Sequence, residues 1–275
     1  MLIVTIIVLV IIGLVSSTFG AIVGLGGGII IVPALIYFGP SLMGEEISTA
    51  TAVGTSLAVL IFTALSSTIS YSKKKLVDFR SSWLFFATSG PASMIGAALT
   101  GKLQDQLFQL VFGFFMLFMA ILMIVKEKMK PRSIAWRTER TYTDSDGNVT
   151  TYGYHWIPVL LIGFAVGFIS GLFGIGGGSL FVPLMVLLFR YPPHVATATS
   201  MFVIFLSSIL GSGMHAYYGE IDWLPVAVLA PSAYIGGRIG AYIAGRMSGK
   251  GLLWLLRITL LVLAVRMIIG GMTSA

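Results

Sequence analysis

The sequence contains no cysteine, and only 10% of its 275 residues are charged. Without cysteine the chain has no disulfides, no thiolate metal ligands and no thiol relay. The shortage of charge says more, because a soluble domain carries about 25% charged residues. With 57% hydrophobic residues and a mean hydropathy of +0.97, the chain is too apolar for a water-soluble globule. The composition indicates a membrane protein.

Long apolar stretches recur along the whole sequence, and most reach the roughly 20 residues with which a helix crosses a bilayer. They are 2–23, 47–71, 83–101, 107–125, 157–173, 195–218, 223–244 and 251–270. No run of alternating strands is present, and backbone groups in lipid must pair internally. We therefore expect an all-α polytopic membrane protein.

A ten-residue element occurs twice, as GLGGGIIIVP at 24–33 and GIGGGSLFVP at 174–183. Six of its ten positions are identical, including three consecutive glycines. A second set of matches has an offset of 144 and pairs Thr55, Ser56 and Asp78 with Thr199, Ser200 and Asp222. The chain is an internal duplication.

The duplication divides the chain into a transmembrane repeat at 1–126, a polar connection at 127–156 and a second transmembrane repeat at 157–275. Within the connection, TYTDSDGNVTTY places a turn signal between strand-favouring flanks, which predicts a β-hairpin. Its Asp144, Asp146 and Asn148 resemble a calcium loop but lack the later glutamate, so a plain turn is favoured and no metal is assigned.

The basic residues of the chain gather in three connections between apolar stretches, and this distribution predicts orientation. These residues are Lys73, Lys74, Lys75 and Arg80, then Lys126, Lys128, Lys130, Arg132, Arg137 and Arg140, and finally Arg246 and Lys250. The positive-inside rule places them in the cytoplasm and both chain termini outside, which explains the net charge of +7 better than nucleic-acid binding does. The connection 72–81 is then inside and its counterpart 219–222 outside, so the two repeats are predicted to be inverted, as in many secondary transporters.

The glycine clusters are the first candidate site. Each precedes a short apolar segment, 29–38 or 179–189, that we expect to be a half-length helix in a hairpin or re-entrant segment; three ordinary spans complete each repeat. Glycines at a helix start leave backbone N–H groups bare at the positive end of the dipole, which favours an anion. The candidate residues are Gly26, Gly27, Gly28, Gly176, Gly177 and Gly178. The alternative is that they only permit close helix packing.

Hydroxyl groups and one buried arginine extend this site. Thr55, Ser56, Thr199 and Ser200 lie early in the second long helix of each repeat, where hydroxyls could donate to an oxyanion or could instead pack and bond backbone. Arg238 lies inside a predicted span, where it could attract an anion or extend to the interface. Aligning Pro91 and Gly96 with Pro231 and Gly236 places Ala98 opposite Arg238.

The ionisable residues give no sign of proton coupling. All acidic residues fall outside or at the edges of the spans, and His194 and His215 lie near span ends, where capping or anchoring is the commoner role. No nucleophile with a base is present at membrane depth, so no enzyme and no cofactor are predicted. An anion leaving a cell that is negative inside gains about 2.3 kcal/mol per charge per 100 mV, which is enough to drive export.

The paired GxGGGxxxVP elements and the TS dipeptides at 55–56 and 199–200 resemble the sulfite exporter TauE/SafE family of prokaryotic permeases. The resemblance spans both halves and implies a multi-pass protein of the cytoplasmic (inner) membrane. It also implies export of a small sulfur-containing anion such as sulfite, sulfoacetate or a related organosulfonate. The alternatives are an anion channel, an importer of another small anion, or a membrane scaffold without transport.

Overall fold

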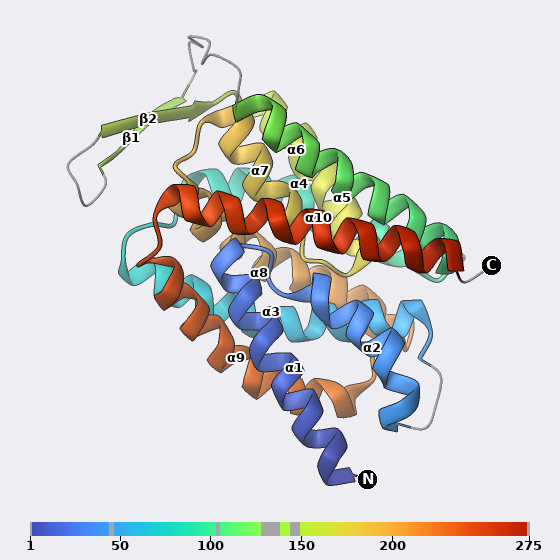
Figure 1. Ribbon diagram of the computed structural model, residues 1–275. Helices are drawn as coiled ribbons and strands as arrows, with labels where there is room; N and C mark the ends of the chain where they lie inside the picture. The colour runs from blue at the N-terminus through green and yellow to red at the C-terminus, as the bar shows by residue number, and fades with distance from the viewer. Residues whose placement is uncertain (1, 44–46, 103–104, 128–137, 144–148, 274–275) are drawn as a thin grey trace.

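The computed structural model describes residues 2–43, 47–102, 105–127, 138–143 and 149–273, which form ten helices and one pair of strands (Figure 1). The first half contains α1 (Leu2–Val23), α2 (Gly28–Met43), α3 (Thr49–Lys73), α4 (Phe79–Thr100) and α5 (Asp105–Glu127). After β1 (Thr138–Thr143) and β2 (Val149–Tyr154), the second half contains α6 (Trp156–Phe173), α7 (Gly178–Phe189), α8 (Pro193–Tyr217), α9 (Trp223–Ala244) and α10 (Gly249–Thr273).

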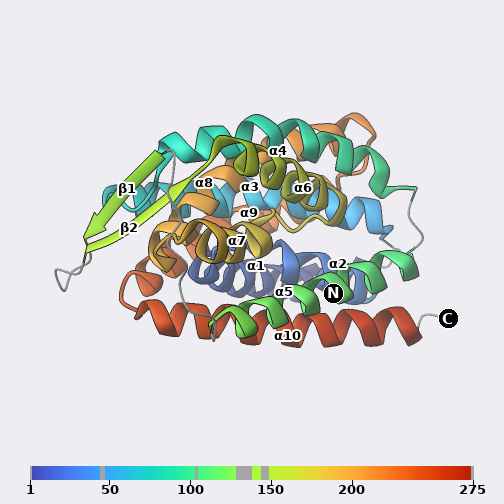
Figure 2. The same cartoon turned by 90° about the horizontal axis from the view of Figure 1, so that it is seen from above.

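The fold is all-α and polytopic, as the composition predicts. Six of the described helices are long and apolar enough to cross a membrane: α1, α3, α6, α8, α9 and α10. Two of them form the interior, because 78% of the apolar window of α3 and 72% of that of α8 are buried, against 25% for α10. Figure 2 shows α10 along one edge of the bundle with α5 beside it. The interior of the bundle is therefore the pair α3 and α8.

The two halves pack against each other reciprocally. Helix α1 lies along α9, and its counterpart α6 lies along α4; α3 also packs on α9, as α8 does on α4 (Figure 1). Helices α3 and α8 contact each other, and so do their outer counterparts α5 and α10. Such an exchange of equivalent contacts is what a two-fold relation between the repeats produces.

These contacts correct the alignment of the third long helix. Gly96 packs on the Phe168 carbonyl, and Gly240 packs on the carbonyl of Thr18. Because Phe168 and Thr18 are equivalent, Gly96 pairs with Gly240 and not with Gly236. The offset is thus 144 here as well, and Met94 rather than Ala98 stands opposite Arg238. Small residues recur one turn apart along both helices, so the sequence alone permits a slip of four residues.

Left-handed backbone at glycine creates the break between the first two helices of each half. Gly26 and Gly27 have φ of 79° and 98°, and Gly176 and Gly177 have 72° and 69°, values that residues with a β-carbon rarely adopt. The helices that follow differ in length from the prediction. Helix α7 has 12 residues, but α2 has 16 and continues past Pro40, so it is five residues longer than expected at its end. A proline inside a membrane helix is tolerated because neighbouring groups satisfy the freed carbonyl.

A β-hairpin connects the two halves. Strands β1 and β2 pair antiparallel, with Thr138 opposite Tyr154 and Thr143 opposite Val149, and the hairpin projects from one end of the bundle (Figure 1). Asp144, Asp146 and Asn148 lie outside the described residues. Arg140 of β1 forms a 3.0 Å ion pair with Asp78.

Tyr152 of β2 donates a 3.4 Å hydrogen bond to the same Asp78 carboxylate. Burial and the neighbouring Asp78 charge raise the pKa of Tyr152, so the phenol remains a donor at neutral pH. The hairpin is thereby attached to the N-cap of α4, because the Asp78 side chain also accepts from the backbone N–H of Ser81.

Candidate functional site

The two glycine turns meet inside the bundle. Gly28 at the start of α2 lies against the carbonyl oxygen of Gly174, and Gly178 at the start of α7 lies against that of Gly24. A β-carbon at Gly28 or Gly178 would collide with the facing oxygen, so both positions require glycine. Segments 150 residues apart in the sequence thus form one buried structure.

One serine of each repeat bonds the glycine turn of the other repeat. The Ser56 hydroxyl donates a 2.9 Å hydrogen bond to the Gly174 carbonyl, and the Ser200 hydroxyl donates a 3.1 Å bond to that of Gly24. Both serines are fully buried. Their hydroxyls therefore hold the backbone of the turns.

The neighbouring threonines make a second reciprocal pair of bonds. Thr199 accepts a 3.1 Å hydrogen bond from the backbone N–H of Asp78, and Thr55 accepts a 3.0 Å bond from that of Asp222. Asp78 and Asp222 begin α4 and α9, so each threonine holds the start of a helix in the other repeat. The four hydroxyl residues predicted from the sequence are brought together as positioning residues around the turns.

The starts of α2 and α7 carry free backbone donors. In α2 the N–H groups of Ile30 and Ile31 both donate to the Gly27 carbonyl, and in α7 Leu180 and Phe181 do the same with Gly177. Among the described residues, no acceptor is bonded to the N–H groups of Gly28, Ile29, Gly178 and Ser179. Four donors at two positive helix ends thus lie in the region where the turns meet.

Two further hydroxyls near the turns were not singled out by the sequence. Ser179, in the first turn of α7, and Thr197, which packs against Gly24, are 1% and 0% exposed. Within the described part of the chain neither hydroxyl has a hydrogen-bond partner. Leaving a buried hydroxyl unpaired costs about 1–3 kcal/mol, so both are candidates to bind a ligand. The sequence signal for Ser179 is its place beside the three glycines, where the first repeat has Ile29.

Apolar side chains close the region around the turns. Leu60 of α3 and Ile204 of α8 are equivalent and fully buried, and both contact Gly26 and Gly176. Each lies one helical turn beyond the serine that bonds the opposite glycine turn. Leu60 and Ile204 therefore form an apolar layer over the free N–H groups.

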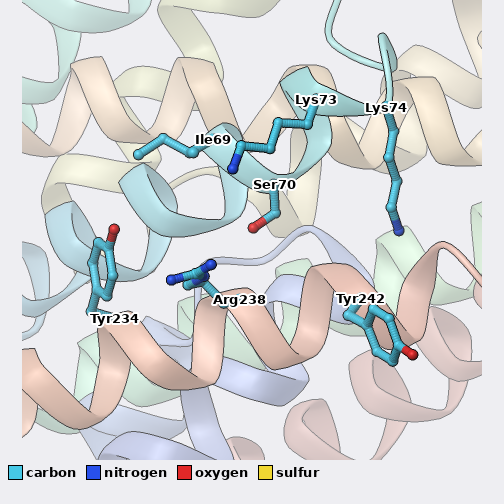
Figure 3. Close-up of a pocket in the computed structure, with 7 residues that line it drawn as sticks. All are labelled: Ile69, Ser70, Lys73, Lys74, Tyr234, Arg238 and Tyr242. Carbon is cyan, nitrogen blue, oxygen red and sulfur yellow. The ribbon is translucent and has the colours of Figure 1, made fainter.

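Arg238 lies apart from the glycine turns, in a pocket of about 410 Å³ between α3 and α9 (Figure 3). This basic pocket is lined by Ile69, Ser70, Lys73, Lys74, Tyr234, Arg238 and Tyr242. Leu60 and Ser70 are ten residues apart on α3, which corresponds to about 15 Å. Among the described residues no carboxylate is paired with Lys73 or Arg238. Arg238 thus lines the basic pocket at the end of α3, so its predicted attraction of an anion stays a prediction and concerns this pocket rather than the glycine turns.

A second pocket of about 740 Å³ adjoins the first and shares Lys74 with it. It lies between the β-hairpin and the helix ends, and its lining includes Arg190, His194 and Arg246. The Arg246 guanidinium stacks 4.0 Å from the centre of the Tyr242 ring, which belongs to the basic pocket. This end of the bundle is thus a continuous basic surface.

A buried histidine of α8, His215, packs against the opposite end of α3. The Nδ1 atom of His215 lies 2.7 Å from an Oε2 atom of Glu220, and the ring is fully buried. Its position near the end of a span favoured a capping or anchoring role for His215. No local pattern reveals the pair, because Glu220 lies beyond the end of α8.

Comparisons with known proteins agree with this architecture. The family model described as "Sulfite exporter TauE/SafE" matches residues 9–267. "Probable membrane transporter protein YunE" of Bacillus subtilis is 44% identical over 270 residues, 98% of this chain and 99% of its own length. A probable membrane transporter protein of Methanocaldococcus jannaschii is 28% identical over 258 residues, which cover 89% of this chain and 88% of its own length.

"Probable membrane transporter protein YfcA" of Escherichia coli is 25% identical over 217 residues, or 78% of this chain and 72% of its own length. No solved structure matches the chain. The family model covers nearly every residue, and the similarity to YunE extends over both repeats and the connection between them. The chain is a membrane transporter that belongs to the sulfite exporter TauE/SafE family.

Proposed function

We propose that this protein exports a small sulfur-containing anion, such as sulfite, sulfoacetate or a related organosulfonate, through a site where the two glycine turns meet. The observation that carries the proposal is the pair of opposed helix starts with four unbonded N–H groups and two unpaired buried hydroxyls. The family description supports sulfite as the type of substrate.

The chemistry of the site suits a sulfur oxyanion. A sulfite or sulfonate group presents three acceptor oxygens, and each helix start carries about half a positive charge. Hydrogen bonds to a charged group contribute about 1.5–3 kcal/mol each, so a few N–H donors suffice for binding. Because none of these donors is a lysine or arginine, the anion is bound by partial charges and can also leave.

The basic pocket would serve as the cytoplasmic approach to this site. Lys73, Lys74 and Arg238 are gathered there without a paired acid among the described residues, and such a surface raises the local concentration of anions. The equivalent positions in the other repeat are Tyr217, Tyr218 and Met94, which carry no charge. In the described part of the chain this pocket thus gathers anions at the end where a substrate for export would enter.

Movement of the repeats would open the site. The apolar layer of Leu60 and Ile204 lies over the turns, and the reciprocal hydrogen bonds join α3 to the second repeat and α8 to the first. In the inverted arrangement, rocking of one repeat against the other exposes the turns to one side at a time. The membrane potential supplies about 2.3 kcal/mol per charge per 100 mV for export.

The test is flux from proteoliposomes loaded with sulfite, sulfate, thiosulfate, sulfoacetate or taurine. We expect efflux of sulfite or an organosulfonate that increases with an inside-negative potential. Ser179→Ala should lower this efflux several-fold, whereas Ser208→Ala should not, although Ser208 is an equally buried and unpaired hydroxyl on α8. The proposal fails if no sulfur anion is transported or if the two serine variants behave alike.

The same panel separates the alternatives. A channel would pass anions without saturation, and an importer of another anion would respond to a different member of the panel. A scaffold would bind none of them, so no anion would raise its thermal stability.

A further inference from the structure

The end of the bundle opposite the basic pocket contains a histidine–carboxylate pair in a distinctive setting. His215 lies in the last turn of α8, and Glu220 lies in the connection to α9, with the ring nitrogen Nδ1 2.7 Å from the carboxylate. The ring is 0% exposed, but the Glu220 side chain is 25% exposed. The pair is therefore buried on the histidine side and reachable by water on the glutamate side.

The equivalent residue in the first repeat is a tyrosine. Tyr71, 144 positions before His215, donates a 2.7 Å hydrogen bond to the carbonyl of Ala21 at the end of α1. The His215 ring faces the carbonyl of Gly171 at the end of α6, which is the equivalent of Ala21. Both repeats thus direct a polar side chain at the same helix end, but only the second uses an imidazole, which can bind a second proton.

A second proton on the His215 ring would change which hydrogen bonds the ring can make. When Nδ1–H donates to the ionised Glu220, the neutral ring presents a bare lone pair at Nε2. This atom is buried and has no hydrogen-bond partner among the described residues, and the group it faces is a carbonyl acceptor. A proton at Nε2 converts this unmatched pair of acceptors into a donor and an acceptor.

Few other charges lie near the pair. Three glycines pack against it: Gly54 of α3 contacts the His215 ring, Gly101 after α4 approaches the Glu220 carboxylate, and Gly171 belongs to α6. Two further charged residues lie beside the segments that pack here: Lys102, which follows Gly101 and is exposed, and Asp222, whose carboxylate caps α9. Glu220 is thus the charged group that directly faces the ring.

Three consecutive residues of α3 connect this pair to the glycine turns. Gly54 packs against both His215 and the Glu220 carbonyl, Thr55 bonds the N–H of Asp222, and Ser56 bonds the carbonyl of Gly174. A movement of the α8–α9 connection against α3 would therefore act directly beside Ser56, the residue whose hydroxyl bonds a glycine turn.

We propose that His215 and Glu220 form a proton-binding site that controls the end of the transporter predicted to face outside, an inference that rests on the proposed transport function. A proton from the outer solution binds at Nε2, and the imidazolium then donates to both Glu220 and the Gly171 carbonyl. These two bonds clamp the α8–α9 connection onto α6 and hold this end closed. Loss of the proton releases the clamp, so export is slow at acidic external pH and fast at alkaline external pH.

The test measures efflux from proteoliposomes at external pH from about 5 to 9, with internal pH fixed. Below the pKa of the pair we expect the rate to fall about tenfold per pH unit, since the deprotonated fraction falls by that factor. His215→Tyr installs the residue that the first repeat has at this position, and it should make efflux independent of pH in that range. His155→Gln changes an exposed histidine before α6 and should retain the wild-type profile.

A readout that does not need transport keeps the two proposals distinct. NMR titration of ¹⁵N-labelled histidine in nanodiscs should show His215 gaining a proton in this range, and Glu220→Gln should shift its midpoint to lower pH. If no anion is transported but His215 titrates, the proposed function fails and the proton site stands. An unchanged pH profile in His215→Tyr, or a His215 that never titrates, overturns the inference. If His215→Tyr does not fold, the same comparison is made with Glu220→Gln.

Discussion

The two ends of α3 are surrounded by different ionisable side chains, although the helices around them belong to a duplicated scaffold. Gly54 and Lys73 are nineteen residues apart, or about 28 Å along the helix, close to the thickness of a bilayer core. The Lys73 end forms the basic pocket, whereas the Gly54 end packs against His215 and Glu220. One end of α3 is thus surrounded by cations, and the other end packs against a histidine–carboxylate pair.

The centre of the molecule shows the opposite behaviour. The bond from Ser56 to Gly174 has an equivalent from Ser200 to Gly24, and the two differ by 0.2 Å in length, 2.9 against 3.1 Å. The contrast teaches that the duplication supplies a nearly symmetric interior. The two repeats differ at the ends, where they have different side chains, and the proposed direction of transport depends on that difference.

The largest expected effect comes from breaking the symmetric centre. Gly178→Val places a branched side chain on the carbonyl of Gly24, which should cost about 3 kcal/mol or more and abolish transport. Thermal unfolding and size-exclusion chromatography measure the loss. Gly213→Val is the control, because a β-carbon at this exposed position of α8 meets no atom within 4 Å. Equal stability of the two variants would contradict the packing of the turns.

The next effect tests the asymmetry of the ends. Arg238→Met installs the residue of the equivalent position, Met94, and removes one of three charges from the basic pocket. We expect the half-saturating anion concentration on the cytoplasmic side to rise about three- to tenfold at low salt and less at high salt. Arg266→Met, on α10 outside the pocket, should leave it unchanged. If both variants raised the half-saturating anion concentration by the same factor, the basic pocket would not be part of the transport route.

A smaller effect tests whether the centre is energetically symmetric. Ser56→Ala and Ser200→Ala each remove one hydrogen bond to a glycine carbonyl, so each should lower the free energy of unfolding by about 1 kcal/mol. Denaturation in detergent compares them with Ser208→Ala, whose hydroxyl is unpaired and should cost less. A much larger loss for one serine than for the other would show that one turn is the main attachment.

The smallest expected effect concerns the hairpin, which is attached to the first-repeat residue Asp78. Arg140→Gln removes its ion pair, and because Arg140 is about one-third exposed the cost should stay below about 1 kcal/mol. Limited proteolysis of the 138–154 segment should become faster. Arg80→Gln, at an exposed neighbouring position, should not change the rate. Equal cleavage rates in the two variants would mean that Tyr152 and the packing of β2 suffice to hold the hairpin.

Much of the fold follows from local features of the sequence. Apolar stretches of sufficient length give the helices, because backbone groups in lipid must pair within the helix. The recurrence of the glycine element gives the duplication, and its glycines give the breaks, because φ near +70 to +100° requires glycine there. The hydroxyl residues near the turns were also found from their recurrence.

Other parts of the candidate site could not be predicted from the sequence. The sequence did not single out Ser179. The structure shows that its hydroxyl is buried and has no hydrogen-bond partner among the described residues. Arg238 looked buried by its place in an apolar stretch, but the end of α3 beside it opens a pocket. The pairing of His215 with Glu220 is visible only in the structure, where the α8–α9 connection places the carboxylate against the ring.

The sequence by itself determined which segments are helices, where the chain breaks and that it is built twice, because propensity, apolar length and glycine conformation act on neighbouring residues. Only the tertiary structure decided that the two glycine turns form one buried centre, that Arg238 lines a basic pocket and that Glu220 lies against His215. The reason is physical: contacts such as Ser56 with Gly174 join residues 118 positions apart, and their geometry is set by helix packing that no local pattern encodes.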